Sequence, residues 1–388
     1  MNSVLEQLSE EHQMLAETVR KFANQVIAPV AAQHDREQSF PYDVVRQMAE
    51  MGLFGLPFPE SAGGMGGDFL SLCLAIEEIA RIDQSLAITL EAAVGLAAMP
   101  IFRAGTDEQK EEFLGPLIRG EAIGAFGLTE PDGGSDASQL RTTARLEGDE
   151  WVINGAKTFI TNSGTSITSL VIVACITGVK PDGTKELSTI IVPNGTPGFT
   201  VDPSYFKLGW HASDTHPLSF NNVRVPAGNL LGERGRGYAN FLQALDEGRI
   251  AIAALGVGAA QGCVDESLRY AKERKAFGKS IGEHQSIAFK IAEMEARTHI
   301  ARLAYYHAAS LLAAGKDFKT EASIAKLVSS EAAMDNARAA TQIFGGYGFM
   351  DEFSVARHYR DSKILEIGEG TSEVQKILIA RSLGLNAQ

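Results

Sequence analysis

The sequence predicts an α+β protein with an N-terminal all-α domain, a middle β domain and a C-terminal helical bundle. Three observations support this fold class. Residues 1–122 have helical periodicity, residues 123–232 contain short β-branched runs between turn residues, and residues 233–388 return to helical patterns rich in Ala, Leu, Glu and Lys. A chain of 388 residues can form two or three domains around a large buried core.

The first 122 residues are expected to be mostly helical. Apolar residues recur on one helix face at Leu15, Val19, Phe22 and Val26. A glycine-rich loop over 61–68 precedes a second helical stretch over 70–90. This loop lacks a Gly-Lys-Ser/Thr ending and a preceding strand, so no phosphate-binding loop is predicted there.

The middle segment is expected to form antiparallel strands in a barrel or sandwich. Short β-branched runs lie at 170–174, 189–193 and 223–226, and Gly, Pro, Asn and Asp separate them. The sequence Glu147-Gly148-Asp149-Glu150 is typical of a hairpin turn. Close spacing without intervening helices argues against βαβ units and a Rossmann domain.

Composition excludes several classes of protein. The formal net charge of −13 argues against nucleic acid and against anionic membranes as partners. The three cysteines have no paired spacing, so neither a disulfide framework nor a zinc site is predicted. No signal peptide is recognised at the N-terminus, and the apolar run 250–260 is shorter than the roughly 20 residues that span a bilayer. We therefore predict a cytoplasmic, metal-free protein.

Glu369 is the most informative residue, because it lies between Gly368 and Gly370 directly before a predicted helix. Glycines let the backbone turn sharply and let a ligand approach closely. Ser372-x-x-Gln375 fits a capping box at the start of that helix. The carboxylate would then serve as a proton acceptor; the alternative is an exposed acidic loop residue.

Two further segments have the composition of a ligand-binding surface. In the segment 126–136, Thr129 and Ser135 supply hydroxyls, and glycines supply bare backbone amides for a polar, planar ligand and a phosphate. In the segment 158–164, Phe159 could stack on a flat cofactor and Thr161 could donate to it. For the segment 126–136, the alternative is a glycine-rich turn capped by Asp136. For Phe159, the alternative is an aromatic core residue on a strand.

Two segments of the C-terminal part could bind a nucleotide. Five cations fall within residues 269–279, where Arg274 could form a forked contact with a pyrophosphate. The alternative is a solvated helix end, where cations are favoured. In 342–349, Gly345 and Gly346 would expose amides at a helix end. The alternative is a glycine C-cap, but three glycines in four residues exceed what a cap needs.

Together these segments resemble the acyl-CoA dehydrogenase family. Residues 126–136 resemble its Thr-Glu-Pro-x-x-Gly-Ser-Asp signature, residues 342–361 its second signature, and 367–371 the segment of its catalytic glutamate. Arg274-x-x-Phe277-Gly278 and Glu283-His284-Gln285 also fit, so the resemblance covers essentially the whole chain. It implies the family's three-domain fold, with a C-terminal four-helix bundle, and FAD as cofactor.

The resemblance also implies roles for individual residues. FAD would contact the residues Phe126, Leu128, Thr129, Ser135, Phe159, Thr161, Thr371 and Glu373 of one subunit. A neighbouring subunit would supply Arg274, Phe277, Gln285, Gln342 and Gly346, so a homotetramer is expected to retain the cofactor. The acyl-CoA would contact Ser135, Asp246, Arg249 and Gly370.

The implied reaction is dehydrogenation of an acyl-CoA thioester to the trans-2-enoyl-CoA. Glu369 would take the α proton, and the β hydride would pass to flavin N5 on the opposite face. An enolate oxygen would receive hydrogen bonds from the backbone N–H of Glu369 and from a ribityl hydroxyl. Burial should raise the pKa of the glutamate. The resemblance further implies an electron-transfer flavoprotein as acceptor and a role in fatty-acid β-oxidation or branched-chain amino-acid catabolism.

Several residues depart from the family pattern. They are Phe159, Gly368, Glu373, His211 and Gln139. Some members carry their base on the helix at the position of Gly248, which has no side chain to act; Glu247, one residue earlier, should point elsewhere. This leaves Glu369 as the base and favours a short-chain or branched substrate.

Two other functions use the same fold. A flavin-dependent oxidase or monooxygenase would consume oxygen without an acceptor protein. A non-catalytic flavin-binding scaffold would keep its flavin oxidised when acyl-CoA is added. The chain length and Glu369 favour the dehydrogenase over both.

Overall fold

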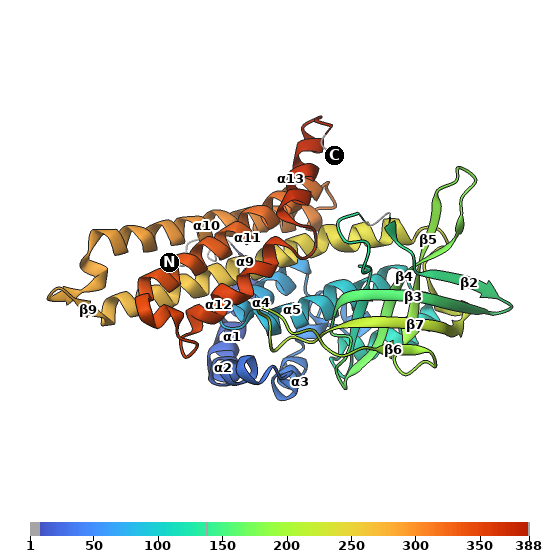
Figure 1. Ribbon diagram of the computed structural model, residues 1–388, viewed down its shortest axis with the longest axis horizontal. Coiled ribbons are helices and arrows are strands. Elements are labelled where there is room, and N and C mark those ends of the chain that lie inside the picture. Colours follow the sequence, from blue (N-terminus) through green and yellow to red (C-terminus); the bar gives the residue numbers. More distant parts are fainter. Residues whose placement is uncertain (1–7, 137–138, 387–388) are drawn as a thin grey trace.

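The computed structural model describes residues 8–136 and 139–386, with the side chains of all but 238–240. Its N-terminal part is helical, as predicted (Figure 1). Three π-helical segments, at Ala23–Ile27, Ala92–Ala98 and Lys110–Leu114, join helices end to end. The α-helices are α1 (Glu10–Phe22), α2 (Ala28–Glu37), α3 (Tyr42–Glu50), α4 (Phe69–Ala80), α5 (Gln84–Glu91), α6 (Met99–Ala104), α7 (Asp107–Gln109) and α8 (Gly115–Ile118).

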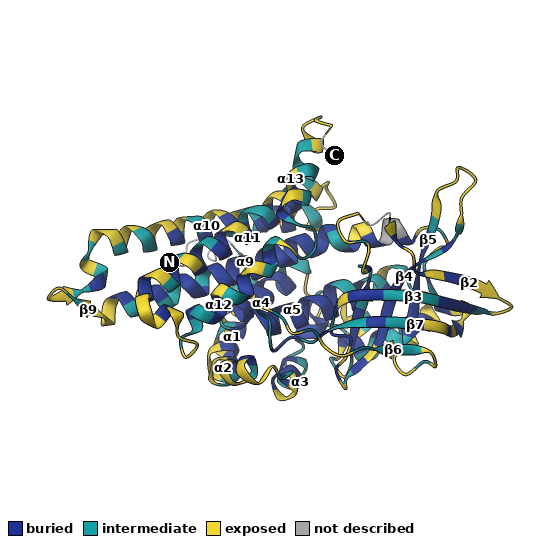
Figure 2. Cartoon of the chain, in the orientation of Figure 1, coloured by how far each residue is buried: buried dark blue, intermediate teal, exposed yellow. Residues whose placement is uncertain are grey.

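Helices α4 and α5 form the centre of the molecule and are almost wholly buried (Figure 2). The continuous helix Gln84–Ala104 is long and apolar enough to cross a membrane by length and composition, but 89% of its most apolar window is buried inside the protein. It is therefore the core helix of this fold, and it is longer than the apolar run 250–260 singled out from the sequence.

The middle part is one eight-stranded sheet, ordered β6-β7-β3-β2-β4-β5-β8, with β1 paired to β4. The predicted hairpin is confirmed, because Glu147 pairs with Glu150 across a two-residue turn. The ladders are antiparallel except for β1–β4 and the single pair Thr143↔Ile176 between β2 and β4. The expectation of antiparallel strands alone is thus wrong for β1, which enters from the helical part and reaches β4 only after two intervening strands. The strands are β1 (Ile123–Gly127), β2 (Thr143–Glu147), β3 (Glu150–Thr161), β4 (Thr168–Val179), β5 (Lys185–Pro193), β6 (Phe199–Val201), β7 (Thr215–Pro226) and β8 (Leu230–Leu231).

The C-terminal part is a helical bundle, as predicted. Helices α9, α10 and α11 lie side by side in Figure 1, and the middle of α9 is buried all round between α4 and α11. A small hairpin of β9 and β10 joins α9 to α10. The elements are α9 (Gly237–Glu273), β9 (Lys275–Ala276), β10 (Lys279–Ser280), α10 (Gln285–Ala313), α11 (Lys319–Phe344), α12 (Ser354–Ser362) and α13 (Ser372–Ser382).

Candidate active site

Glu369 lies in a strained turn between a 3-10 segment at Lys363–Glu366 and α13. Its φ is +50°, in the left-handed region that a residue with a side chain rarely adopts, and Gly370 follows at +91°. Such a conformation costs of order 1 kcal/mol and persists only where neighbouring contacts hold it. The predicted capping box is wrong by one residue: Thr371 is the N-cap and accepts from the N–H of Val374 at 3.2 Å.

Two buried side chains hold this turn through the carbonyl oxygen of Gly370. Gln375 donates to it at 2.9 Å, which explains why its side chain does not close a capping box. Lys326 of α11 donates to the same oxygen at 2.8 Å. Burial lowers the pKa of Lys326 to about 8. Side chains of both α11 and α13 therefore hold the turn in place.

The Glu369 carboxylate points into the protein against α9. In the part of the chain that the structure describes, neither of its oxygens has a hydrogen-bond partner. A Cβ added to Gly248 would lie 2.3 Å from Oε2 of Glu369, so only glycine allows this approach. Glu247 points elsewhere, as expected, and forms an ion pair with Arg103.

Burial raises the pKa of Glu369 to about 7, while the nearby charges of Lys326 and Arg249 oppose the shift. The pKa of Glu369 was expected to rise when an acyl chain covers it, but burial by the protein alone already raises this pKa. A carboxylate with a pKa near neutrality is well matched to proton abstraction at physiological pH.

Two of the predicted substrate residues lie on α9 beside the turn. Arg249 and Asp246 are buried and form an ion pair, and Lys319 lies 3.6 Å from the Asp246 carboxylate. The charge of Arg249 acts on Glu369, and Gly370 follows Glu369 directly. The structure therefore brings Glu369, Gly370, Asp246 and Arg249 together.

A buried ion pair joins the two segments predicted to contact the flavin. Lys157 of β3 donates to Glu130 at 2.7 Å and to the carbonyl oxygen of Leu128 at 3.1 Å. The N–H of Thr158 donates to the carbonyl oxygen of Thr129 at 2.9 Å. The segments 126–136 and 158–164 therefore form one surface. Sequence reasoning missed this pair, whose signal is the single cation of β3, Lys157.

Phe159 is turned outward by a bulge in β3. The register with β7 shifts between Lys157 and Ile160, and Phe159 has a φ of +60°. Its side chain is 65% exposed, with its ring 5.2 Å from that of Tyr205. The alternative of a core aromatic residue is therefore wrong, and a flat ring has room to stack here.

The other residues of this surface differ in exposure. Phe126 packs edge-on against Phe241 with ring centroids 4.4 Å apart, and Leu128 packs against the same small apolar cluster. Thr161 is half-buried at the end of β3, whereas Ser135 is exposed. The side chains of Phe126 and Leu128 are thus partly committed to packing.

The five residues expected from a neighbouring subunit gather at the far end of the bundle. The Arg274 guanidinium lies over the ring of Tyr347 at 5.7 Å, and Phe277 at the hairpin tip is 96% exposed. Figure 1 shows the β9 hairpin and the sheet at opposite ends of the molecule. The structure thus brings five residues together, but not with the flavin surface of the same chain: Arg274, Phe277, Gln285, Gln342 and Gly346.

The remaining predicted positions have plain structural surroundings. Glu373 is exposed in the first turn of α13, where its own N–H and the Thr371 hydroxyl lower the pKa of its carboxyl. His211 lies 3.1 Å from Asp35 and 2.9 Å from the carbonyl oxygen of Lys207. Gln139 donates to Asp136 at 3.1 Å. The N–H of Gly368 donates to Ile364 at 2.7 Å, which closes the 3-10 segment.

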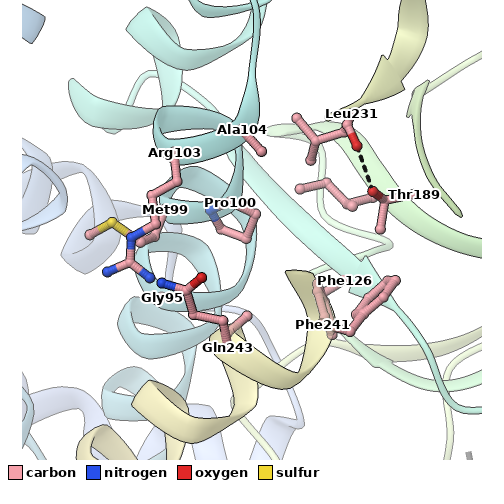
Figure 3. Close-up of a pocket in the computed structure, with 12 residues that line it drawn as sticks. Gly95, Met99, Pro100, Arg103, Ala104, Phe126, Thr189, Leu231, Phe241 and Gln243 are labelled. Carbon is pink, nitrogen blue, oxygen red and sulfur yellow. Dashed lines mark hydrogen bonds between the residues drawn. The ribbon is translucent and has the colours of Figure 1, made fainter. Parts of the chain in front are cut away.

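A small cavity separates the core helix from the sheet (Figure 3). Gly95, Met99, Phe126 and Phe241 contribute to its lining, and its volume of about 30 Å³ has room for about one water molecule. An acyl chain does not fit into this volume, so we regard the cavity as a packing gap between the helices and the sheet.

The exposed surface has the features that a flavin dinucleotide needs. Phe159 offers a free aromatic face, and nothing lies within 4 Å of a Cβ built on Gly134, Gly345 or Gly346. Bare glycine amides bind phosphate oxygens, and an exposed arginine such as Arg274 pairs with a pyrophosphate. The residues present therefore fit FAD, provided that two copies of the chain contribute.

Comparison with known proteins agrees with this geometry. Sequence models of the acyl-CoA dehydrogenase N-terminal, middle and C-terminal domains match residues 9–121, 125–223 and 235–384. The probable acyl-CoA dehydrogenase YngJ of Bacillus subtilis is 48% identical over 97% of this chain and 99% of its own length. The structure of butyryl-CoA dehydrogenase from Megasphaera elsdenii is 42% identical, with a TM-score of 0.93 over 97% of this chain and 98% of its own. A chain from a study of the electron transferring flavoprotein of Acidaminococcus fermentans is 40% identical, with a TM-score of 0.93 over 97% and 98% of the two chains.

The chain belongs to the acyl-CoA dehydrogenase family. It is an oxidoreductase of a family of FAD-binding flavoproteins. The family, the three-domain fold, the enzyme class and the cofactor predicted from the sequence are thereby confirmed.

Proposed function

We propose that this enzyme dehydrogenates a short-chain or branched acyl-CoA, with Glu369 as the catalytic base. One observation carries the proposal: a buried carboxylate without hydrogen-bond partners among the described residues, with a pKa of about 7, is held at a strained turn. The similarity to butyryl-CoA dehydrogenase supports a short acyl chain, and Gly368, which has no side chain beside the base, leaves space for a branch.

Each residue of the site has a distinct part in the proposed reaction. Glu369 takes the α proton, and its own N–H, which donates to no group within residues 8–136 and 139–386, is available to the developing enolate oxygen. One such donor lowers a barrier by about 3 kcal/mol. FAD, when bound, accepts the β hydride as a two-electron acceptor. Arg249 and Asp246 orient the thioester.

The pH dependence follows from the raised pKa of Glu369. The base acts when ionised, so the rate of flavin bleaching by an acyl-CoA should rise with pH and level off above the pKa of about 7. Anaerobic single-turnover rates across about pH 5.5 to 9 measure this midpoint. A flat profile, or one that falls with rising pH, would contradict a carboxylate base.

We further propose that FAD binds across an interface within a homotetramer. The β9 hairpin, which Arg274 directly precedes, and the sheet that carries Phe159 lie at opposite ends of one chain, so a second copy must bring its Arg274 end to the Phe159 surface (Figure 1). Exposed apolar residues at the hairpin end of the bundle and along α10 support an interface: Phe277, Phe289, Ile300, Leu303 and Phe349.

Replacing Arg274 with Ala should weaken retention of FAD without unfolding the chain. The side chain is exposed and lies over the ring of Tyr347, whereas a forked contact with a pyrophosphate is worth about 1.5–3 kcal/mol. FAD content after gel filtration, and the thermal midpoint of apoprotein, report the two effects separately. Lys272→Ala, also exposed near the end of α9, is the matched control. Equal FAD content in both variants would count against the interface.

The electron acceptor is proposed to be an electron-transferring flavoprotein, in keeping with the Acidaminococcus fermentans study. The three cysteines are buried and unpaired, which fits a reducing compartment such as the cytoplasm. Turnover with butyryl-CoA should require the acceptor flavoprotein or an artificial dye. Oxygen consumption at the same rate without either would make the enzyme an oxidase.

Acyl-chain preference decides the substrate class. Straight thioesters from C4 to C16 and branched short thioesters should be mixed anaerobically with the enzyme, and the loss of flavin absorbance recorded. We expect the fastest bleaching with the short or branched compounds. Fastest bleaching with the C16 compound would reject the proposed substrate class.

A further inference from the structure

Glu91 is a buried carboxyl group that forms no ion pair or hydrogen bond with the described residues that would explain it as a structural residue. It is the last residue of α5, directly before the π-helical segment Ala92–Ala98, and it is fully buried. Of all the carboxylates whose side chains are described, only Glu91 and Glu369 have two buried oxygens without a hydrogen-bond partner. Buried polar groups are nearly always hydrogen-bonded, so both exceptions need an explanation.

The other buried glutamates show what a structural carboxylate looks like in this fold. Each is matched by cations or by a hydroxyl. Glu78 accepts from Arg20 and Arg81, and Glu77 accepts from Arg302 and Tyr305. Glu91 has no such partner.

Glu91 and Glu369 interact with each other across the site. Each carboxyl group shifts the pKa of the other, and two carboxyl groups can form a hydrogen bond only when one of them is protonated. The charges that face Glu369 are Lys326 from α11 and Arg249 from α9, and both favour its ionised form. No cation acts on Glu91, whose pKa is raised well above its usual value by burial and by the charge of Glu369. The proton therefore belongs on Glu91.

We propose that the two carboxyl groups share one proton, and that Glu91 donates a hydrogen bond that aims the Glu369 carboxylate at the α carbon. Glu91 is then a positioning residue, and its role rests on the proposed function of Glu369 as base. In the reaction the Cα–H bond breaks, the proton goes to Glu369, and the electron pair stays on the α carbon of the thioester. The pair passes from one proton and one negative charge to two protons and no charge.

This arrangement accounts for a residue that folding alone would not favour. A carboxyl group at this depth costs stability, and an apolar side chain of similar size would pack without that cost. Groups kept at the expense of stability are concentrated at functional sites. The adjoining π-helical segment is also a feature found often at such sites.

Two variants of the holoenzyme test the proposal through the pH profile of flavin bleaching by butyryl-CoA. In Glu91→Leu the donor is lost while burial is kept, so the pKa of Glu369 should rise and the midpoint should move up by about one pH unit. Glu91→Gln keeps a donor and should return the midpoint toward that of the wild type. The thermal midpoint of Glu91→Leu should equal or exceed that of the wild type. If Glu91→Leu does not fold, Glu91→Thr removes the same donor with a smaller polar side chain.

Controls separate the possible outcomes. Glu77→Gln, which disturbs a paired buried carboxylate on α4, should lower the thermal midpoint without moving the pH midpoint. An unmoved pH midpoint in Glu91→Leu, or a midpoint that falls because two negative charges had repelled each other, would overturn the shared proton. If Glu369→Gln bleached at the wild-type rate, Glu369 would not be the base, and the proposed function would fail together with the shared proton. That outcome is distinguishable from an unmoved pH midpoint in Glu91→Leu.

Discussion

Replacing Gly248 with Ala should slow flavin bleaching by an acyl-CoA about 100-fold while leaving the FAD content unchanged. The added methyl group would lie 2.3 Å from Oε2 of Glu369, so the carboxylate must move away from α9. The turn that carries it is held by Lys326 and Gln375 and cannot follow freely. A displacement of about 1 Å at a reacting group is enough for a loss of this size.

The control for this prediction is Gly228→Ala. Nothing lies within 4 Å of a Cβ at that position, and its backbone is outside the left-handed region. Single-turnover bleaching and FAD absorbance should be measured for both variants, together with the thermal midpoint. If Gly248→Ala bleaches as fast as Gly228→Ala, the carboxylate does not need its place against α9, and the site geometry described here is wrong.

The order of helices, sheet and helices was predictable because it depends on local periodicity. Leu15, Val19 and Phe22 lie on one helix, and the turn at 147–150 has the residues that a tight hairpin needs. The parallel pairing of β1 with β4 was not predictable, since strand order depends on contacts between segments about 45 residues apart. The cap of α13 was misplaced by one residue because the Gln375 side chain donates to the carbonyl oxygen of Gly370, in the turn before the helix, and closes no capping box.

The candidate site was predictable where a motif lies within one segment. Glu369 between two glycines is such a case, and so is the exposed Phe159. Glu91 and Lys326 were missed because their partners lie in the turn at 369–370, far away in the sequence. A signal for Glu91 was present in the sequence: it is a lone charged residue within an apolar helical run, where burial of a charge is costly.

Replacing Glu369 with Gln should slow flavin bleaching by roughly 1,000-fold or more, because an amide cannot accept the α proton. The change keeps the shape of the side chain and leaves the Gly370 contacts with Lys326 and Gln375 in place, so the turn should persist. It also removes a buried negative charge, whose loss of hydration costs stability, so folding should not suffer. The variant should therefore be yellow, assembled and able to bind acyl-CoA.

The most direct test is anaerobic mixing of butyryl-CoA with wild-type enzyme and Glu369→Gln at equal flavin content, followed by visible absorbance. We predict rapid bleaching of the wild type, and in the variant only the spectral perturbation of a bound ligand. Bleaching of Glu369→Gln at a rate near that of the wild type would contradict the assignment of Glu369 as the base.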